Sequence, residues 1–128
     1  MNEPGARTVL VAEDDERLRK LHEQSLKRAG FRILLASNGH QALSMARRER
    51  PDAILLDVRM PVLSGYEVAR LLKFDDRYRS IPILMLSAQG ATADEKLGYE
   101  TGADRYLIKP MPYEKLVSEI HSVLGEDR

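Results

Sequence analysis

The sequence contains no cysteine, carries no net charge and has no long apolar run. Without cysteine there can be no disulfide framework, no thiolate metal site and no thiol nucleophile. Twenty basic and twenty acidic side chains leave no overall field that would draw the protein to nucleic acid or to an anionic membrane. The apolar runs are far shorter than the roughly 20 residues of a membrane helix, and the N-terminus lacks the apolar core of a signal peptide. We therefore expect a cytoplasmic protein.

The length and composition predict a single domain. The chain has 128 residues, of which 43% are hydrophobic and 31% charged, as is ordinary for a globular fold. The first residues are polar and rich in helix breakers. We expect a flexible leader over residues 1–7, one folded domain over 8–125 and a short tail over 126–128.

Five short apolar stretches predict strands. Most of them lack polar alternation, which is typical of strands covered on both faces, as in the centre of a parallel sheet. Segments with helical spacing of apolar residues, several of them preceded by capping residues, lie between the strands. Five strand-then-helix units predict an α/β fold in which helices cover both faces of a parallel sheet. The strands are expected at 8–12, 31–36, 53–56, 83–86 and 104–108, and the helices at about 16–29, 40–50, 64–74, 92–101 and 113–124.

Polar side chains follow four of these five strands. Right-handed crossovers bring the carboxyl ends of parallel strands to one edge of the sheet, so these groups should converge. Carboxylates gathered in one crevice repel each other, which raises their pKa values or demands a cation. Oxygen ligands favour Mg²⁺, with Mn²⁺ as an alternative. The converging groups are Glu13, Asp14 and Asp15 after the first strand, Asp57 after the third, Ser87 after the fourth and Lys109 after the fifth.

This set of side chains suits phosphoryl chemistry. The hydroxyl of Ser87 and the ammonium of Lys109 can hold anionic oxygens, and the central carboxylate of Asp57 can attack phosphorus. The sequence therefore predicts an aspartyl phosphate at Asp57.

Four motifs, in this order and spacing, resemble the receiver domain of two-component response regulators. The resemblance covers residues 8–125 and implies a flavodoxin-like fold with strand order 2-1-3-4-5 and five helices. It also implies a signalling domain that catalyses only its own phosphorylation and dephosphorylation. The phosphoryl donor would be a sensor histidine kinase or a phosphotransfer protein. The motifs are VLVAEDD at 9–15, LLDVRMPVLSG at 55–65, LSA at 86–88 and GADRYLIKP at 102–110.

The resemblance implies a role for each residue of the site. Asp57 would be the phosphoacceptor, and Ser87 and Lys109 would hold phosphoryl oxygens. Asp15 leaves one alternative open, because it is also placed to cap the following helix instead of joining the metal site. The Mg²⁺ ligands would be Glu13, Asp14, Asp57 and the backbone carbonyl of Arg59.

The resemblance further implies a switch. Ser87 and Tyr106 would change position together, although the strand pattern alone makes Tyr106 a half-buried edge residue. The variable positions Arg59 and Gln89 would tune the lifetime of the phosphoryl group. The Lys109–Pro110 peptide bond would be cis. A downstream protein would bind the face of the fourth helix, fifth strand and fifth helix, and no nucleic acid or membrane would bind this domain.

Two other classes of protein remain as alternatives. A phosphohydrolase with an aspartyl-phosphate intermediate usually has a second acid two residues after the nucleophile, where this chain has Arg59. A flavodoxin-like electron carrier that binds FMN should have Ser, Thr and Gly in its first loop, where this chain has the acids of 13–15. The three histidines lie in separate predicted helices without metal-ligand spacing and are expected at the surface or at an edge: His22, His40 and His121.

Overall fold

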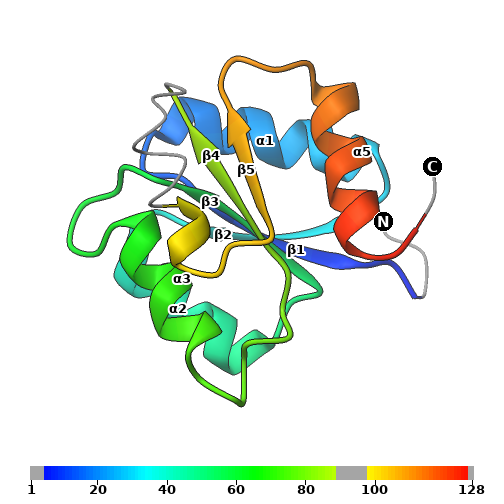
Figure 1. Cartoon of the computed structure of the whole chain (residues 1–128). Helices are drawn as coiled ribbons and strands as arrows, with labels where there is room; N and C mark the ends of the chain where they lie inside the picture. Colours follow the sequence, from blue (N-terminus) through cyan, green and yellow to red (C-terminus); the bar gives the residue numbers. More distant parts are fainter. Residues whose placement is uncertain (1–4, 89–97, 127–128) are drawn as a thin grey trace.

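The core of the protein is a five-stranded parallel sheet (Figure 1). The computed structural model describes residues 5–88 and 98–126. The strand order β2-β1-β3-β4-β5 confirms the order expected from the resemblance. The strands are β1 (Thr8–Ala12), β2 (Arg32–Ala36), β3 (Ala53–Asp57), β4 (Ile83–Ser87) and β5 (Arg105–Ile108).

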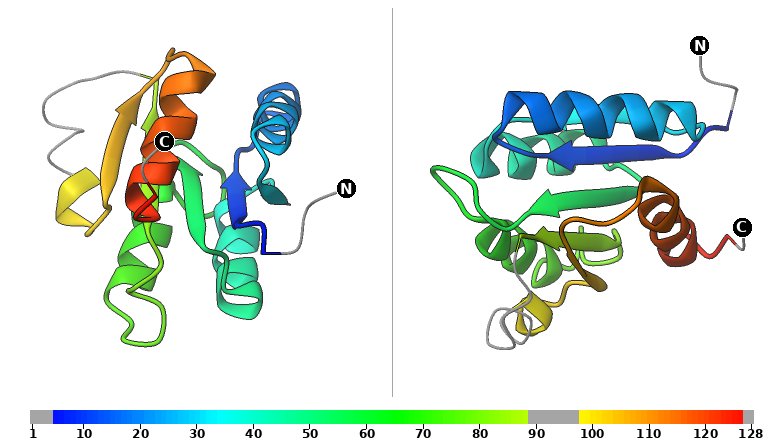
Figure 2. Two further views of the ribbon diagram at one scale, coloured as in Figure 1. Left: turned by 90° about the vertical axis from the view of Figure 1, so that its right-hand side faces the viewer. Right: turned by 90° about the horizontal axis from the view of Figure 1, so that it is seen from above.

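Helices cover both faces of the sheet (Figures 1 and 2). Helices α1 (Glu16–Arg28) and α5 (Tyr113–Val123) pack on one face, and α2 (Gly39–Glu49) and α3 (Gly65–Lys73) pack on the other. The helix expected over 92–101 lies mostly outside the described residues, although residues 98–100 are helical. In the described part of the chain, no helix is long and apolar enough to cross a membrane.

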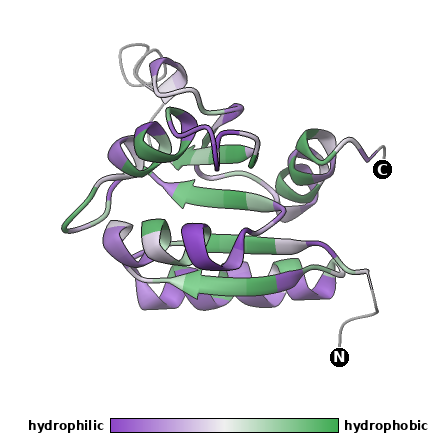
Figure 3. Ribbon diagram, turned by 90° about the horizontal axis from the view of Figure 1, so that it is seen from below, coloured by the Kyte–Doolittle hydropathy of each residue, from purple (hydrophilic) through white to green (hydrophobic). Residues whose placement is uncertain are grey.

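The apolar strands explain this layered arrangement. All five residues of β3 are buried, as are the last four of β1. Successive residues point to opposite faces, so Leu10 joins the cluster under α2 and α3 while Val9 and Val11 join the cluster under α1 and α5. Figure 3 shows the hydrophobic strands between helices that carry hydrophilic segments. The continuous apolar pattern of these strands is therefore the consequence of burial on both faces.

Local sequence sets where the helices begin. The Asp15 carboxylate accepts a hydrogen bond from the Leu18 N–H at 3.1 Å and caps α1. Ser64 caps α3 in a reciprocal pair with Glu67, since each side chain accepts from the other residue's backbone N–H. Such caps satisfy backbone donors that have no partner within the helix.

Apolar spacing alone does not give the buried face of every helix. Leu21 in α1 and Leu71 in α3 belong to the apolar spacing of their helices, but 43% and 44% of their surfaces are exposed. In α1 the buried stripe instead runs through His22 and Leu26, which lie four residues apart on one face of the helix. The expectation of surface or edge histidines is also wrong for His22 and for His121, which are 7% and 9% exposed. Which face of a helix is buried depends on the elements that pack against it, so a polar residue such as His22 can lie on the buried face.

Two backbone features shape the carboxyl-terminal edge of the sheet. The start of α3 passes so close to the end of β3 that a Cβ atom on Gly65 would lie 2.3 Å from the carbonyl oxygen of Asp57. Glycine is therefore required at that position. The Lys109–Pro110 peptide bond is cis, as expected, and the Lys109 N–H donates to the Ser87 carbonyl at 2.6 Å. The ends of β3, β4 and β5 are thus held close together.

Candidate functional site

Asp57 lies at the end of the central strand β3 and is 8% exposed. Its Oδ2 atom is 3.3 Å from the Nζ atom of Lys109, and its Oδ1 atom accepts the Arg59 N–H at 3.1 Å. Both carboxylate oxygens are therefore held by donors that come from two different loops. This confines the side chain to one orientation at the edge of the sheet.

Two further acids follow β1 and approach Asp57. Glu13 is 2% exposed, and its Oε1 atom is also 3.3 Å from Lys109 Nζ. Carboxylate oxygens of Glu13, Asp14 and Asp57 all lie within 4.8 Å of one another. Asp15 is absent from this group among the described residues, and its carboxylate caps α1 instead. The geometry therefore favours Glu13 and Asp14 over Asp15 as the acidic pair.

The pKa values of the three acids reflect their burial and their closeness to one another. Burial and the neighbouring Glu13 raise the pKa of Asp57 to about 7. Burial and Glu13 also raise the pKa of Asp14. Burial opposes ionisation of Glu13, but His22, Asp57 and Lys109 together hold its pKa well below the usual range. The single positive charge of Lys109 therefore does not balance the negative charge of the three carboxylates.

This donor set fits a hard divalent cation. Mg²⁺ prefers carboxylate and carbonyl oxygens and usually keeps several waters. Asp14 is exposed while Asp57 and Glu13 are buried, so the group is open to solvent on one side. A cation there would also relieve the repulsion that raises the pKa of Asp57.

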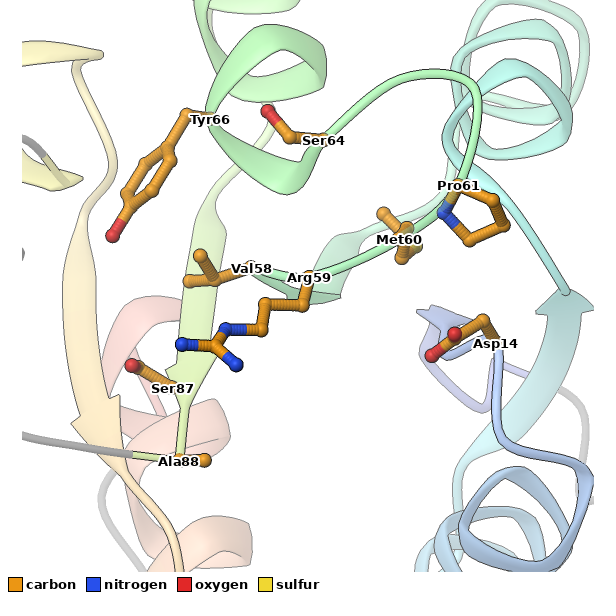
Figure 4. A pocket seen from close by; sticks show the side chains of 9 residues that line it. All are labelled: Asp14, Val58, Arg59, Met60, Pro61, Ser64, Tyr66, Ser87 and Ala88. Carbon is orange, nitrogen blue, oxygen red and sulfur yellow. The ribbon is translucent and has the colours of Figure 1, made fainter.

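A pocket of about 570 Å³ opens at this edge of the sheet (Figure 4). In the view of Figure 4, Asp14 lies on one side of the opening and Ser87 lies on the other, with the side chain of Arg59 between them. Ser87 ends β4 and is 7% exposed. The structure thus brings a hydroxyl and a guanidinium to the same opening as an acid. The lining residues are Asp14, Val58, Arg59, Met60, Pro61, Ser64, Tyr66, Ser87 and Ala88.

Of the residues expected to act as a switch or to tune lifetime, Ser87, Tyr106 and Arg59 are described, and Gln89 lies outside the described residues. Tyr106 is 7% exposed, so the strand pattern that suggested a half-buried ring was wrong. The ring lies 6.1 Å from that of Tyr99, and the Tyr106 hydroxyl is buried without a hydrogen-bond partner among the described residues. Its switch role stays a prediction.

Sequence reasoning missed two polar residues next to the acids. The Nε2 atom of His22 lies 3.7 Å from Glu13 Oε1, and its Nδ1 atom lies 3.0 Å from the Tyr113 hydroxyl. The available signal was spacing, because His22 is four residues after Leu18 and four before Leu26 in the apolar stripe of α1. A polar residue in such a stripe must find a partner when it is buried.

Comparison with known proteins gives a consistent result. Residues 9–121 match the family model described as the response regulator receiver domain. The chain is 35% identical over 120 residues to the polar-differentiation response regulator DivK of Brucella anthropi, and the match covers 94% of this chain and 98% of that protein. It is 41% identical over 118 residues to the response regulator MprA of Mycobacterium leprae, covering 91% of this chain and 50% of that protein.

Solved structures agree with these relatives. A putative response regulator from Chloroflexus aurantiacus has a TM-score of 0.89 at 32% identity, with 94% of this chain and 99% of that one covered. The receiver domain of the sensor histidine kinase PA1611 from Pseudomonas aeruginosa, solved with a magnesium ion coordinated in its active-site cleft, has a TM-score of 0.88 at 32% identity. That match covers 95% of this chain and 100% of that one.

The curated relatives differ in length. The chain spans nearly all of DivK, but only 44% of the probable transcriptional regulator ycf27 of Guillardia theta and 51% of the transcriptional regulatory protein AfsQ1 of Streptomyces coelicolor. The shared part is the region that carries the acidic group, the pocket and the lysine.

Proposed function

The chain belongs to the receiver-domain family of two-component response regulators, and on that premise we propose that Asp57 accepts a phosphoryl group in a Mg²⁺-dependent transfer. The donor is a sensor histidine kinase or a phosphotransfer protein. One observation carries the proposal: the carboxylate of Asp57 lies within 4.8 Å of two other acids and 3.3 Å from the ammonium of Lys109. This is an acidic group beside a cation, at the strand end where open α/β sheets place their ligands.

Asp57, Lys109 and Ser87 have different roles in the proposed transfer. An oxygen of the ionised Asp57 carboxylate forms the bond to phosphorus as the bond between phosphorus and the donor's leaving group breaks. Lys109 keeps that carboxylate oriented beforehand, and afterwards its ammonium can bind a phosphoryl oxygen. The Ser87 hydroxyl, at the pocket, can bind another.

The ligand set proposed for Mg²⁺ comes from two loops. Asp14 and Asp57 supply carboxylate oxygens, the Arg59 carbonyl supplies a neutral oxygen, and Glu13 acts through a water molecule. When bound, the ion neutralises charge on the acids and on the phosphoryl oxygens. Mn²⁺ has similar preferences and could replace it.

We further propose that the output is an altered protein surface. After phosphorylation, Ser87 and Tyr106 would shift together and bias the face formed by residues 98–100, β5 and α5 toward a partner-binding state. The buried Tyr106 hydroxyl without a partner is the observation that supports a second position for this ring. The chain would thus catalyse only its own phosphorylation and dephosphorylation, and no nucleic acid would bind this domain. The domain limits expected from the sequence and its cytoplasmic location stay predictions.

The phosphorylation proposal can be tested by intact-mass measurement. Wild type, incubated with acetyl phosphate and Mg²⁺, should gain the mass of one phosphoryl group, and chelation of the metal should prevent the gain. Asp57→Asn should gain none. Asp52→Asn is the matched control, because that aspartate lies at the opposite edge of the sheet and should leave the modification intact. Modification of Asp57→Asn at the wild-type level would contradict the proposal.

The alternative functions have their own readouts. A phosphohydrolase would turn over a phosphomonoester such as p-nitrophenyl phosphate through many cycles, and an electron carrier would retain a yellow flavin. The acids at 13–15 remain an argument against flavin phosphate, and Arg59 against the hydrolase. We expect neither turnover nor colour.

We propose that Arg59 lengthens the lifetime of the phosphoryl group. Its side chain lies in the pocket together with Ser87 (Figure 4). In this proposal the water molecule that attacks phosphorus approaches through that pocket. A bulky cation there restricts or reorients that water. Arg59→Asn should therefore lose its phosphoryl group faster than wild type, as measured by the decay of the phosphorylated mass. An unchanged decay rate would contradict this role. Gln89, the other position expected to tune lifetime, lies outside the described residues.

A further inference from the structure

Three side chains form a continuous polar line from α5 to the acidic group. The Tyr113 hydroxyl, at the start of α5, lies 3.0 Å from the Nδ1 atom of His22 on α1. The other ring nitrogen of His22, Nε2, lies 3.7 Å from the Oε1 atom of Glu13. The two rings meet edge to face, with centroids 5.8 Å apart and planes at 72°. Neither His22 nor Tyr113 has a part in the function proposed above.

The burial of His22 requires an explanation. The residue is 7% exposed, and Glu13 beside it is 2% exposed. The Nε2 atom is fully buried and has no partner within hydrogen-bond distance among the described residues. A buried polar atom without a partner is unfavourable, so the group that faces this nitrogen is the natural place to look for its role.

The contact between Tyr113 and Nδ1 allows two arrangements of the imidazole proton. A neutral imidazole has one donor nitrogen and one acceptor nitrogen, and the Tyr113 hydroxyl can either accept from Nδ1–H or donate to a bare Nδ1. In the second arrangement, on which the proposal rests, the imidazole proton is on Nε2, the nitrogen that faces Glu13. A shift of a few tenths of an ångström would bring that N–H within hydrogen-bond range of the carboxylate.

We propose that His22 is a positioning residue for the acidic site: held by Tyr113, it directs its Nε2–H toward Glu13 and keeps that carboxylate in the orientation that serves Mg²⁺. The inference rests on the metal site of the proposed function and adds a residue to it. It also joins the start of α5 to the acidic group, because a movement of Tyr113 would release the ring of His22. Partners that orient the groups around a metal commonly change its affinity by about 10- to 100-fold when they are removed.

The first test is Mg²⁺ affinity, measured by titration calorimetry without any phosphoryl donor. His22→Leu should bind Mg²⁺ about tenfold more weakly than wild type. Tyr113→Phe, which removes only a hydroxyl, should bind about threefold more weakly. The double variant should match His22→Leu alone, because Tyr113 acts through His22. Independent packing effects would instead multiply to about thirtyfold.

Two kinds of variant separate positioning from packing. His22→Gln places an amide N–H near the site of Nε2 and should recover most of the affinity, whereas His22→Asn, whose amide is too short to reach Glu13, should not. His40→Leu and Tyr78→Phe are matched controls, since His40 is exposed and Tyr78 is buried elsewhere, under the guanidinium of Arg50. Both should bind Mg²⁺ as wild type does.

The second test needs no metal. In chelated protein, ¹⁵N-resolved NMR of the imidazoles should show His22 as the Nε2–H tautomer, and Tyr113→Phe should perturb that signal. A Nδ1–H tautomer in wild type, or equal Mg²⁺ affinity in wild type and His22→Leu, would overturn the inference. Failure of the wild-type protein itself to bind Mg²⁺ would overturn the metal site of the proposed function, and the inference about Glu13 and Mg²⁺ with it. The two failures are therefore distinguishable.

Discussion

At the amino-terminal edge of the sheet Asp52 and Asp104 each have a cation beside them, whereas at the carboxyl-terminal edge three acids share one lysine. Asp52 accepts the N–H of Thr8 at 2.7 Å and lies 3.5 Å from Arg7. Asp104 accepts the N–H of Ile83 at 2.8 Å and lies 2.7 Å from Lys73. Both acids thus cap the first residue of a neighbouring strand while their charge is compensated.

The acids at the two edges have different roles. Those at the amino-terminal edge are structural, whereas those at the carboxyl-terminal edge are functional. Charges paired one to one, with a backbone donor in addition, stabilise the ends of the strands. An excess of acid destabilises the fold, and protonation or a bound cation relieves it. Burial first, and then the neighbouring Glu13, raise the pKa of Asp57, and the second cause reflects this excess. The predictions below test the comparison by changing one edge at a time.

The largest effect is expected from Asp104→Ala at the amino-terminal edge. The change removes the acceptor of the Ile83 N–H and leaves the ammonium of Lys73, whose side chain is 10% exposed, without its carboxylate. The free energy of unfolding should fall by about 2–3 kcal/mol. Urea denaturation followed by circular dichroism measures the loss. Asp104→Asn, which keeps an acceptor oxygen, should lose less, and phosphorylation of Asp57 should survive in both variants.

A change of opposite sign is expected from Asp57→Asn at the carboxyl-terminal edge. The amide can still accept the Arg59 N–H, but it removes one negative charge from beside Glu13. At pH 8, without metal, the free energy of unfolding should rise by about 1–2 kcal/mol. If Asp57→Asn were as destabilising as Asp104→Ala, the carboxylates at both edges would stabilise the fold, and the contrast between the two edges would be wrong. Added Mg²⁺ should stabilise wild type and have a smaller effect on the variant.

The pH dependence of stability should show the same contrast. In the ion-free protein the pKa of Asp57 is raised from 3.8 to about 7, so between these values the folded state binds more protons than the unfolded state. Stability should therefore fall as the pH rises toward 7 and above, by about 1 kcal/mol or more between pH 5 and pH 8. The shift at Glu13 is downward and acts below pH 4.5, outside this window. Asp57→Asn should abolish most of the decline, as measured by denaturation in chelator.

The smallest effect is expected from Arg7→Ala. The guanidinium contacts both Asp52 and Glu126, but 45% of its side chain is exposed. Water and salt screen such pairs, so the free energy of unfolding should fall by no more than about 0.5 kcal/mol. The difference in melting temperature between wild type and Arg7→Ala should be smaller at high salt than at low salt. A loss comparable to that of Asp104→Ala would show that the more exposed pairs of Arg7 matter as much as the partly buried pair of Asp104 and Lys73.

Much of the fold and of the acidic site follows from short stretches of sequence. The residues of β3 are apolar up to an acid, and the edge at which that acid lies follows from right-handed crossovers. The caps Asp15 and Ser64 follow equally from local chemistry. The resemblance to receivers supplied the strand order, which apolar patterns do not contain.

Other features depend on contacts between distant parts of the chain. Leu21 belongs to the apolar spacing of α1 and His22 was expected at the surface or an edge, but in the packed helix Leu21 is exposed and His22 is buried. The strand pattern left Tyr106 half-buried, and the neighbouring residues cover it. Counting from the apolar run favours Glu13 and Asp14 and leaves Asp15 as an alternative, and the position of Asp57 shows which two acids approach it.

The sequence by itself therefore determined which residues form strands, where acids follow them and which helices are capped, because these properties depend on neighbours a few residues apart. Only the tertiary structure decided which acids share one site and which ring nitrogen faces them. Those properties depend on the contact between α1 and α5 and on the parallel sheet, which brings the ends of β1, β3 and β5 to one edge. There the side chain of Lys109 reaches both Glu13 and Asp57. Burial then strengthens the interactions between these charges, because the effective dielectric constant is lower inside the protein than in water.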